Sequence, residues 1–355
     1  MLSEEEACAT AATAESYQEL DPKRKAERTK LQETCISLSC KEIVPELLKL
    51  VKEDNILSKE ILPSFEEENA CGDGVLREIY SIFWQNFVSD NCFGSSQFAV
   101  RIVPQMPDKY VALGRIITHQ FLQYGTFPVQ LARASVHHML FGKVSKDCLL
   151  DSFLQLLPPK QRDIFAGALQ GQRPFPLDEV IDVLDDHNVQ TLPSPENLRG
   201  IVLQIATTEF VEKPFLALLK IREGMGRFWD EVSPQSIDAI YQLCVATPST
   251  VIDHLHCVPL DAQEAKVFRW LKRYVSEADP GMLTRLVQFC TASQTLLPDQ
   301  NISVKMENMQ EMAMRQKART CFQILQLPRN YFSFHQLKEN LDFYLSPCTS
   351  WEFED

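Results

Sequence analysis

The sequence predicts a bilobal α+β fold, with a mainly helical first lobe and a smaller α+β second lobe. Apolar residues recur at helical spacing through much of the first 255 residues. Short strand patterns follow after residue 300, and a helix pattern comes after them. Prolines and polar residues interrupt the helical periodicity at residues 246–262. Because the stripes on either side are expected to bury separately, we place a hinge there.

The predicted domain boundaries follow from these patterns. Residues 1–40 are expected to form a tail without stable structure, because residues 1–30 have almost no large apolar side chains to offset their ordering entropy. Residues 41–255 form the first lobe, residues 256–262 the hinge, and residues 263–355 the second lobe.

Composition limits the class of protein. The chain has 355 residues, of which 45% are hydrophobic and 23% charged, as is usual for a globular protein. A net charge of −13 argues against a general nucleic-acid binder. Eleven cysteines without framework spacing favour a reducing compartment, and neither a membrane span nor a signal peptide is evident. We expect a cytoplasmic or nuclear protein without membrane association.

The first lobe is predicted from three helical patterns. Residues 41–57 carry Leu47 and Val51 on one side of a helix. A glycine turn at residues 72–74 leads into a helix with a large apolar face. Residues 110–124 form a third helix that Gly125 ends, and Pro128 begins another that reaches Gly142.

The second lobe begins with a helix after Asp261 and continues into short strands. Ile302 to Val304 alternates as a strand does, and Phe322, Ile324 and Leu325 are predicted to be a short buried strand that Pro328 ends. Ser333 and Gln336 have the spacing of a capping box, which predicts a helix with Leu337 and Leu341 on its buried side.

Cys321 is the candidate nucleophile, at the mouth of the loop that precedes this strand. Arg315, Lys317 and Arg319 surround it with positive charge, which favours the thiolate form. The alternative is an inert core cysteine, since most buried cysteines are unreactive.

Other histidines and cysteines do not predict a metal site. Cys35 and Cys40 have no second ligand pair at suitable spacing, and His254, His256, Cys257 and Cys244 lie too close together along a helix end and linker. We expect no metal and no cofactor.

The segment around Cys321 resembles the active-site segment of HECT-type ubiquitin ligases. It contains Thr-Cys-Phe-x-x-Leu-x-Leu-Pro at residues 320–328, a few dozen residues before the end of the chain. Residues 286–293, Leu-Val-Gln-Phe-Cys-Thr-Ala-Ser, are similar to the helix end and turn that precede that segment in the family. Residues 71–78, 110–117 and 221–225 are similar to segments of its first lobe.

The resemblance implies an enzyme that accepts ubiquitin from a ubiquitin-conjugating enzyme as a thioester on Cys321 and passes it to a lysine of a protein substrate. Residues 170–215 would then bind the conjugating enzyme. The family also carries a phenylalanine near its C-terminus that assists the second transfer, a role that Phe353 or Trp351 is expected to take here.

Departures from the family pattern leave alternatives open. Ala292 stands where the family has a glycine, Arg319 where many members have a histidine, and a Gly-Phe turn is missing. One alternative is a HECT-derived protein that has lost transfer activity and binds conjugating enzyme or ubiquitin non-covalently. Another is an unrelated helical scaffold. A papain-like hydrolase fits less well, because only His335 follows Cys321.

Overall fold

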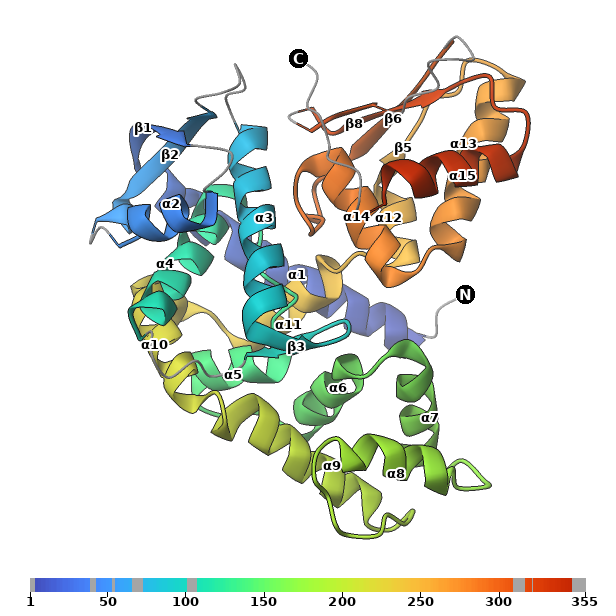
Figure 1. Cartoon of the computed structure of the whole chain (residues 1–355). Helices are drawn as coiled ribbons and strands as arrows, with labels where there is room; N and C mark the ends of the chain where they lie inside the picture. Colours follow the sequence, from blue (N-terminus) through green and yellow to red (C-terminus); the bar gives the residue numbers. More distant parts are fainter. Residues whose placement is uncertain are drawn as a thin grey trace.

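A computed structural model describes residues 4–38, 43–52, 55–65, 73–100, 107–308, 317–320 and 322–346. These residues are mostly helical and include three small sheets (Figure 1). The predicted α+β class is therefore confirmed. None of the described helices is both long and apolar enough to cross a lipid bilayer.

The chain up to residue 243 is built mainly from helices. Its elements are α1 (Glu4–Arg28), β1 (Gln32–Leu38), α2 (Ile43–Leu50), η1 (Ile56–Ser58), β2 (Lys59–Phe65), α3 (Asp73–Asn91), β3 (Cys92–Gly94), β4 (Phe98–Val100), α4 (Pro107–Tyr124), α5 (Arg133–Phe141), α6 (Lys146–Leu156), α7 (Pro159–Leu169), α8 (Leu177–Asp185), α9 (Leu198–Thr207), η2 (Thr208–Glu212), α10 (Phe215–Met225), η3 (Arg227–Glu231) and α11 (Pro234–Leu243). Strands β1 and β2 pair in parallel, and β3 and β4 form a hairpin.

The rest of the chain combines helices with a four-stranded sheet. Its elements are α12 (Pro248–His254), β5 (Leu255–His256), α13 (Ala262–Glu277), α14 (Pro280–Thr291), β6 (Ile302–Glu307), β7 (Lys317–Arg319), β8 (Ile324–Pro328) and α15 (Phe334–Tyr344). The strand order is β5-β6-β8-β7; β6 is parallel to β5 and β8, whereas β7 is antiparallel to β8. Figure 1 shows this part as the orange and red region.

Buried apolar side chains form three clusters. The first core joins α1–α5, α10 and α11 and runs from Tyr17 to Cys244. The second core runs from Ala246 to Leu345 and belongs to residues 246–346, which we call the C-terminal unit. The third core lies mainly among α6–α9, the green helices at the bottom of Figure 1, which we call the helical subdomain (residues 146–207).

Most predicted elements are present with the expected buried faces. The stripe along residues 113–124 is buried in α4, and Gly125 follows that helix at φ 75°. The helix after Pro128 begins later than predicted, at Arg133, and Gly142 follows it in a left-handed conformation. Asp261 caps α13, accepting hydrogen bonds from the backbone of Gln263 and Glu264.

The strand and the helix after Cys321 are present as predicted, although Ile324, which was predicted to be buried, is only half-buried. Leu325 and Leu327 are fully buried in β8, which ends at Pro328. Ser333 caps α15 by accepting from the backbone of Gln336, as predicted, but the side chain of Gln336 accepts from the backbone of Phe332 rather than from that of Ser333. Phe322, however, was predicted in the buried strand and is 73% exposed, because the chain is still turning at this residue before β8 begins.

The N-terminal segment differs from the predicted tail. Residues 4–28 form α1, and Tyr17 and Leu20 are buried in the first core. Thr13 donates to Gln242 of α11 at 2.8 Å, and the buried Arg24 donates to the carbonyl of Leu122 at 3.3 Å. Few apolar residues are enough here because the rest of the domain supplies their partners; composition alone does not show this.

The change from one core to the next also differs from the predicted hinge. The first core ends at Cys244 and the second begins at Ala246, upstream of residues 256–262. Strand β5, at the start of the predicted hinge, pairs with β6 inside the C-terminal unit. Val251 and Leu255 are buried in the second core, so α12 belongs to that unit.

Candidate functional site

Cys321 and Arg315 lie outside the described residues, as do the side chains of Lys317 and Arg319. The chain on either side of Cys321 is described. Strands β7 and β8 pair with Arg319 opposite Ile324, so the connection between them is short. Its last residue, Gln323, has φ 54°; its backbone amide donates to the carbonyl of Thr320 at 3.4 Å, and its carbonyl accepts from Ser303 at 2.9 Å.

One face of α3 holds the C-terminal unit through polar contacts. Arg77 donates to the carbonyl of Thr320 at 3.4 Å, and Ser81 donates to the carbonyl of Ala292 at 2.8 Å. Gln85 donates to Oε1 of Gln288 in α14 at 2.7 Å. We call this row of contacts the α3 seam. Spacing of four residues places its three donors on one side of the helix, so that the seam reaches the residue before Cys321.

A cavity of about 300 Å³ opens at the same boundary. Its lining combines Arg77, Tyr124 and Thr126 of the N-terminal part with residues of the C-terminal unit that include Asp299 and Gln323. Lys25 of α1 lies 3.9 Å from Asp299 at this boundary. The end of the connection that contains Cys321 therefore lines a polar space between the two parts of the chain.

Glu78 is buried within the α3 seam. Only 7% of the residue is exposed, and its Oε2 atom has no hydrogen-bond partner among the described residues. Burial raises the pKa of the Glu78 carboxyl to about 7, although a hydrogen bond from Gln288 opposes the shift. The carboxyl can therefore change its charge near neutral pH.

Four of the six described free cysteines are poor nucleophiles. Burial raises the pKa of the Cys244 and Cys290 thiols to about 12. It also raises the pKa of Cys148 and Cys257. The raised pKa keeps these thiols protonated at neutral pH. They are poor nucleophiles because the thiolate is the reactive form. Cys35 is exposed on β1, far along the chain from the segment around Cys321 that resembles the HECT family.

His254, which was considered as a metal ligand, makes other contacts. Both ring nitrogens of His254 face carbonyl oxygens, those of Thr250 at 2.6 Å and Leu297 at 3.1 Å. No group of three or more potential ligands that could hold a metal occurs among the described residues.

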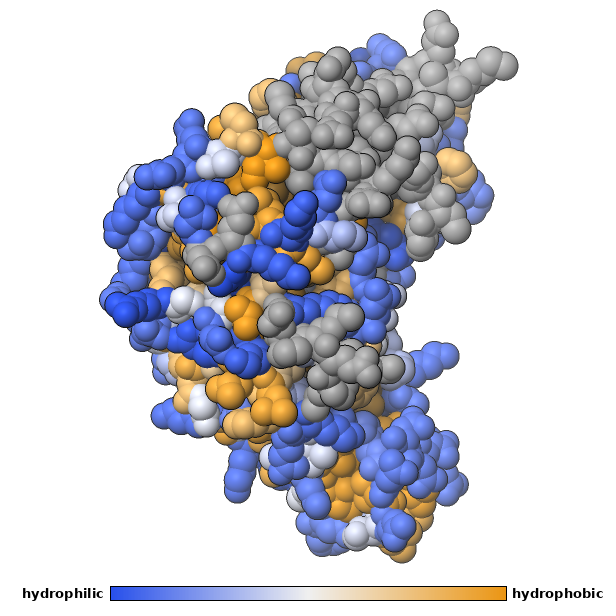
Figure 2. All heavy atoms as spheres, turned by 60° about the vertical axis from the view of Figure 1, so that its left-hand side comes forward, coloured by the Kyte–Doolittle hydropathy of each residue, from blue (hydrophilic) through white to orange (hydrophobic). Residues whose placement is uncertain are grey.

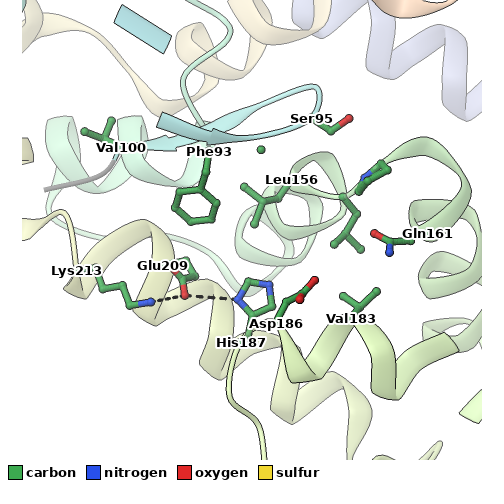
Figure 3. Close-up of a pocket in the computed structure, with 13 residues that line it drawn as sticks. Phe93, Ser95, Val100, Leu156, Gln161, Val183, Asp186, His187, Glu209 and Lys213 are labelled. Carbon is green, nitrogen blue, oxygen red and sulfur yellow. Dashed lines mark hydrogen bonds and ion pairs between the residues drawn. The ribbon is translucent and has the colours of Figure 1, made fainter. Parts of the chain in front are cut away.

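A larger cavity, of about 740 Å³, lies where the β3–β4 hairpin meets the helical subdomain. Figure 3 shows Phe93, Val100 and Leu156 among its apolar side chains, and a polar chain along one edge. In this chain Glu209 lies 2.5 Å from Nζ of Lys213 and 3.5 Å from Nδ1 of His187. Burial disfavours the charged form of Glu209, but hydrogen bonds from His187 and Lys213 outweigh it and lower the pKa.

Sequence reasoning did not single out the α3 seam. The residues of the seam alternate with the buried stripe that predicted the helix, and they look like an ordinary solvated face. A signal was present in the four-residue spacing of Arg77, Ser81 and Gln85. The identity of their partners, two backbone carbonyls and one glutamine, depends on the tertiary fold.

Comparison with known proteins bears on the C-terminal part. Residues 234–354 match the family model described as HECT-domain (ubiquitin-transferase). The matched region includes Cys321 and the turn at Ala292. Residues 71–78, 110–117 and 221–225, whose resemblance was also noted, lie before it. No curated protein matches the chain.

Proposed function

We propose that the protein is a HECT-type ubiquitin transferase that holds ubiquitin as a thioester on Cys321, because residues 234–354 match the HECT-domain family model. The observation that carries this proposal is the family match, which spans the one cysteine whose surrounding sequence has the family pattern. The raised pKa values of the buried cysteines support the choice, because they remove Cys290 and Cys244 as rivals.

The reaction is two acyl transfers. The Cys321 thiolate attacks the thioester carbonyl that joins ubiquitin to the cysteine of a conjugating enzyme. A new carbon–sulfur bond forms, the old one breaks, and the conjugating enzyme leaves as a thiolate. A substrate lysine amine then attacks the new thioester, loses a proton to solvent and forms an amide, while Cys321 is released as a thiolate. Exchange between thiols is nearly isoenergetic, so positioning is the main task of the protein.

The fold supports a mechanism with two successive transfers. The first and second cores are separate hydrophobic clusters, and we propose that they act as two lobes. The seam between them is polar, with hydrogen bonds from Arg77, Ser81 and Gln85, rather than a continuous apolar core. Polar interfaces separate more readily than apolar ones. The C-terminal unit can therefore turn between the donor and the acceptor, as two successive transfers require.

Thioester formation tests the proposal. Purified protein is incubated with ubiquitin, activating enzyme and a panel of conjugating enzymes, and the products are separated on non-reducing gels. The expected result is an adduct that disappears with reductant and is absent in Cys321→Ala. Cys290→Ala removes a buried thiol and Cys35→Ala an exposed one; both are expected to keep the adduct. An adduct that persists in Cys321→Ala would show that the assignment is wrong.

A second candidate function is non-covalent binding by a transferase-derived protein without activity. Ala292 favours it, because this residue follows α14 with φ 58°, a conformation that favours the glycine found in the family. Arg319 in place of the usual histidine favours it as well. Wild-type protein that binds a charged conjugating enzyme in a pull-down but never forms the adduct would support this candidate.

We propose that the helical subdomain binds the conjugating enzyme. Leu177 is 38% exposed and Leu192 is 69% exposed, both within the predicted residues 170–215. Figure 2 shows hydrophobic surface at the lower end of the molecule, at the height of α8 and α9 in Figure 1. Exposed apolar patches of this kind are common at protein interaction sites.

A matched pair of substitutions tests this binding site. Leu192→Asp is expected to slow charging of Cys321 by weakening binding of the conjugating enzyme. Leu216→Asp changes a leucine of α10 with similar exposure, 66%, outside the helical subdomain, and is expected to leave charging unchanged. Equal charging by the two variants would place the binding site elsewhere.

A further inference from the structure

The burial of Glu78 at the α3 seam has no compensating charge. The carboxyl lies between α3 and α14, and its described hydrogen-bond partner is the neutral amide of Gln288. The Oε1 atom of the same amide accepts from Gln85 at 2.7 Å and from Gln294 at 3.4 Å. Two side chains thus orient Gln288 so that its NH₂ group is left for Glu78.

The charged residues beside Glu78 in α3 and one turn before Gln288 in α14 make contacts elsewhere. Arg77, next to Glu78 in α3, directs its guanidinium to the carbonyl of Thr320. Arg285, one turn before Gln288 in α14, lies on the Tyr274 and Asp279 side of its helix, inside the C-terminal unit. The loop after α14 adds the neutral Ser293 and Gln294. No charged residue among those described acts on the Glu78 carboxyl.

We propose that Glu78 is a proton-sensitive latch, which holds the C-terminal unit against α3 when its carboxyl is neutral and weakens that contact when it ionises. A neutral carboxyl can stay buried beside an amide. An ionised one in the same place is a buried charge without a counter-ion, and separation of the two surfaces returns it to water.

The direction of the pH effect follows from the two states. In the closed seam the pKa of Glu78 is raised to about 7, whereas a solvated glutamate in the open form has a value near 4.5. The closed form is therefore fully favoured below pH 4.5. Between pH 4.5 and about 7 the closing equilibrium falls by about tenfold per pH unit, and above that it levels off. Acidification closes the seam.

The consequence for catalysis rests on the proposed function. The seam ends at Thr320, so a closed latch holds the chain in one orientation at the residue before Cys321. Transfer to a second partner requires release from that orientation. The conformational switch itself can be measured without ubiquitin, so its failure and the failure of the proposed function are distinguishable.

Small-angle X-ray scattering of the whole chain at pH 5.5 and pH 8 tests the latch. Wild-type protein is expected to be more compact at pH 5.5 and to have a larger radius of gyration at pH 8. Glu78→Gln keeps the size and hydrogen-bonding capacity of the side chain but cannot ionise. It is expected to stay compact at both values. Glu209→Gln changes a similarly buried carboxyl, 6% exposed, in the π-helix η2, and is expected to respond as wild type does.

Carboxyl ¹³C NMR gives a second readout in case the variant folds poorly. The Glu78 resonance, identified as the one that Glu78→Gln lacks, is expected to titrate well above 4.5 and in the same pH range as the scattering change. A wild-type pH response in folded Glu78→Gln would overturn the proposal. So would a constant radius of gyration in wild-type protein, or a Glu78 titration near 4.5.

Discussion

The guanidinium of Arg77 donates a hydrogen bond across 3.4 Å to the carbonyl oxygen of Thr320, the residue immediately before Cys321. This contact joins residues 243 positions apart and links the first helix after the parallel β1–β2 pair to the segment proposed to carry ubiquitin. Its acceptor is a backbone atom. The contact therefore constrains the path of the chain at Thr320 whatever the side chain there.

Removal of this contact is expected to slow thioester formation. Arg77→Ala deletes a charged donor, but the 3.4 Å length makes the bond a weak one, so we expect a loss of about 1 kcal/mol, or about fivefold in the single-turnover rate of Cys321 charging. Arg28→Ala is the matched control, because Arg28 pairs with Glu60 within the N-terminal part. Equal rates for the two variants would mean that Arg77 does not position the segment.

The turn after α14 is expected to accept the glycine that the family carries. Ala292 is fully buried at φ 58°, a conformation that costs an L-residue about 1–2 kcal/mol. Ala292→Gly removes this strain and loses one buried methyl group, which is about 0.8 kcal/mol. The free energy of unfolding in urea should therefore rise by about 0.5 kcal/mol.

The control for this turn is Ala239→Gly in α11, which removes an equally buried methyl group from a helix interior. Here there is no strain to relieve, and glycine also lowers the helix propensity. We expect a loss of about 1.5 kcal/mol. A decrease in stability for both variants would show that Ala292 is not strained in the native protein.

Local patterns in the sequence were enough to predict many of the elements. Ser333 and Gln336 predicted the start of α15, and Leu337 and Leu341 its buried side, because capping and helical periodicity depend on residues close in the chain. Strand β8 was predicted for the same reason. Phe322 was misplaced because strand periodicity does not show where a turn ends.

The features that were not predicted depend on distant partners. Helix α1 has few large apolar residues and was predicted to be unstructured. Tyr17 and Leu20, which are buried among its described side chains, find their neighbours in the rest of the first core. Glu78 looked like a solvated helix residue, and its burial depends on α14. The assignment of Cys321 came from resemblance; its local charge pattern left a core cysteine open as the alternative.

Acid is expected to destabilise the first core through His119. The residue is 1% exposed, with Nδ1 2.5 Å from the hydroxyl of Tyr80 and Nε2 2.9 Å from the carbonyl of Lys59. Burial lowers the pKa of His119 from 6.5 to about 4. The native protein thus holds His119 in the neutral form, and the contribution of this residue to the free energy of unfolding is fully present above pH 6.5. It is lost at about 1.4 kcal/mol per pH unit between 6.5 and 4.

The His119 effect is best measured in a Glu78→Gln background, because the raised pKa of Glu78 acts in the opposite direction over an overlapping pH range. Urea unfolding at pH 5 and pH 7 should give a steep slope, which His119→Gln flattens. His335→Gln, at a side chain that is 79% exposed, should leave the slope unchanged. A slope that survives in His119→Gln would assign acid sensitivity to another group.

The closest helix packing in the first core is expected to depend on Gly114 and Gly224. A Cβ atom at Gly114 of α4 would lie 1.9 Å from the carbonyl oxygen of Ile221 in α10, and one at Gly224 would lie 2.0 Å from that of Val111. Backbone atoms cannot move aside as a flexible side chain can, so Gly114→Ala forces the two helices apart. We expect a loss of about 3 kcal/mol or more in the free energy of unfolding.

The matched control is Gly200→Ala in α9, where a Cβ would meet nothing within 4 Å. There alanine only improves helix propensity and should raise stability by about 0.5–1 kcal/mol. Urea unfolding of wild type and the two variants measures these changes. The free energy of unfolding is expected to fall for Gly114→Ala and to rise for Gly200→Ala. An unchanged free energy of unfolding for Gly114→Ala would show that α4 and α10 do not approach this closely in solution.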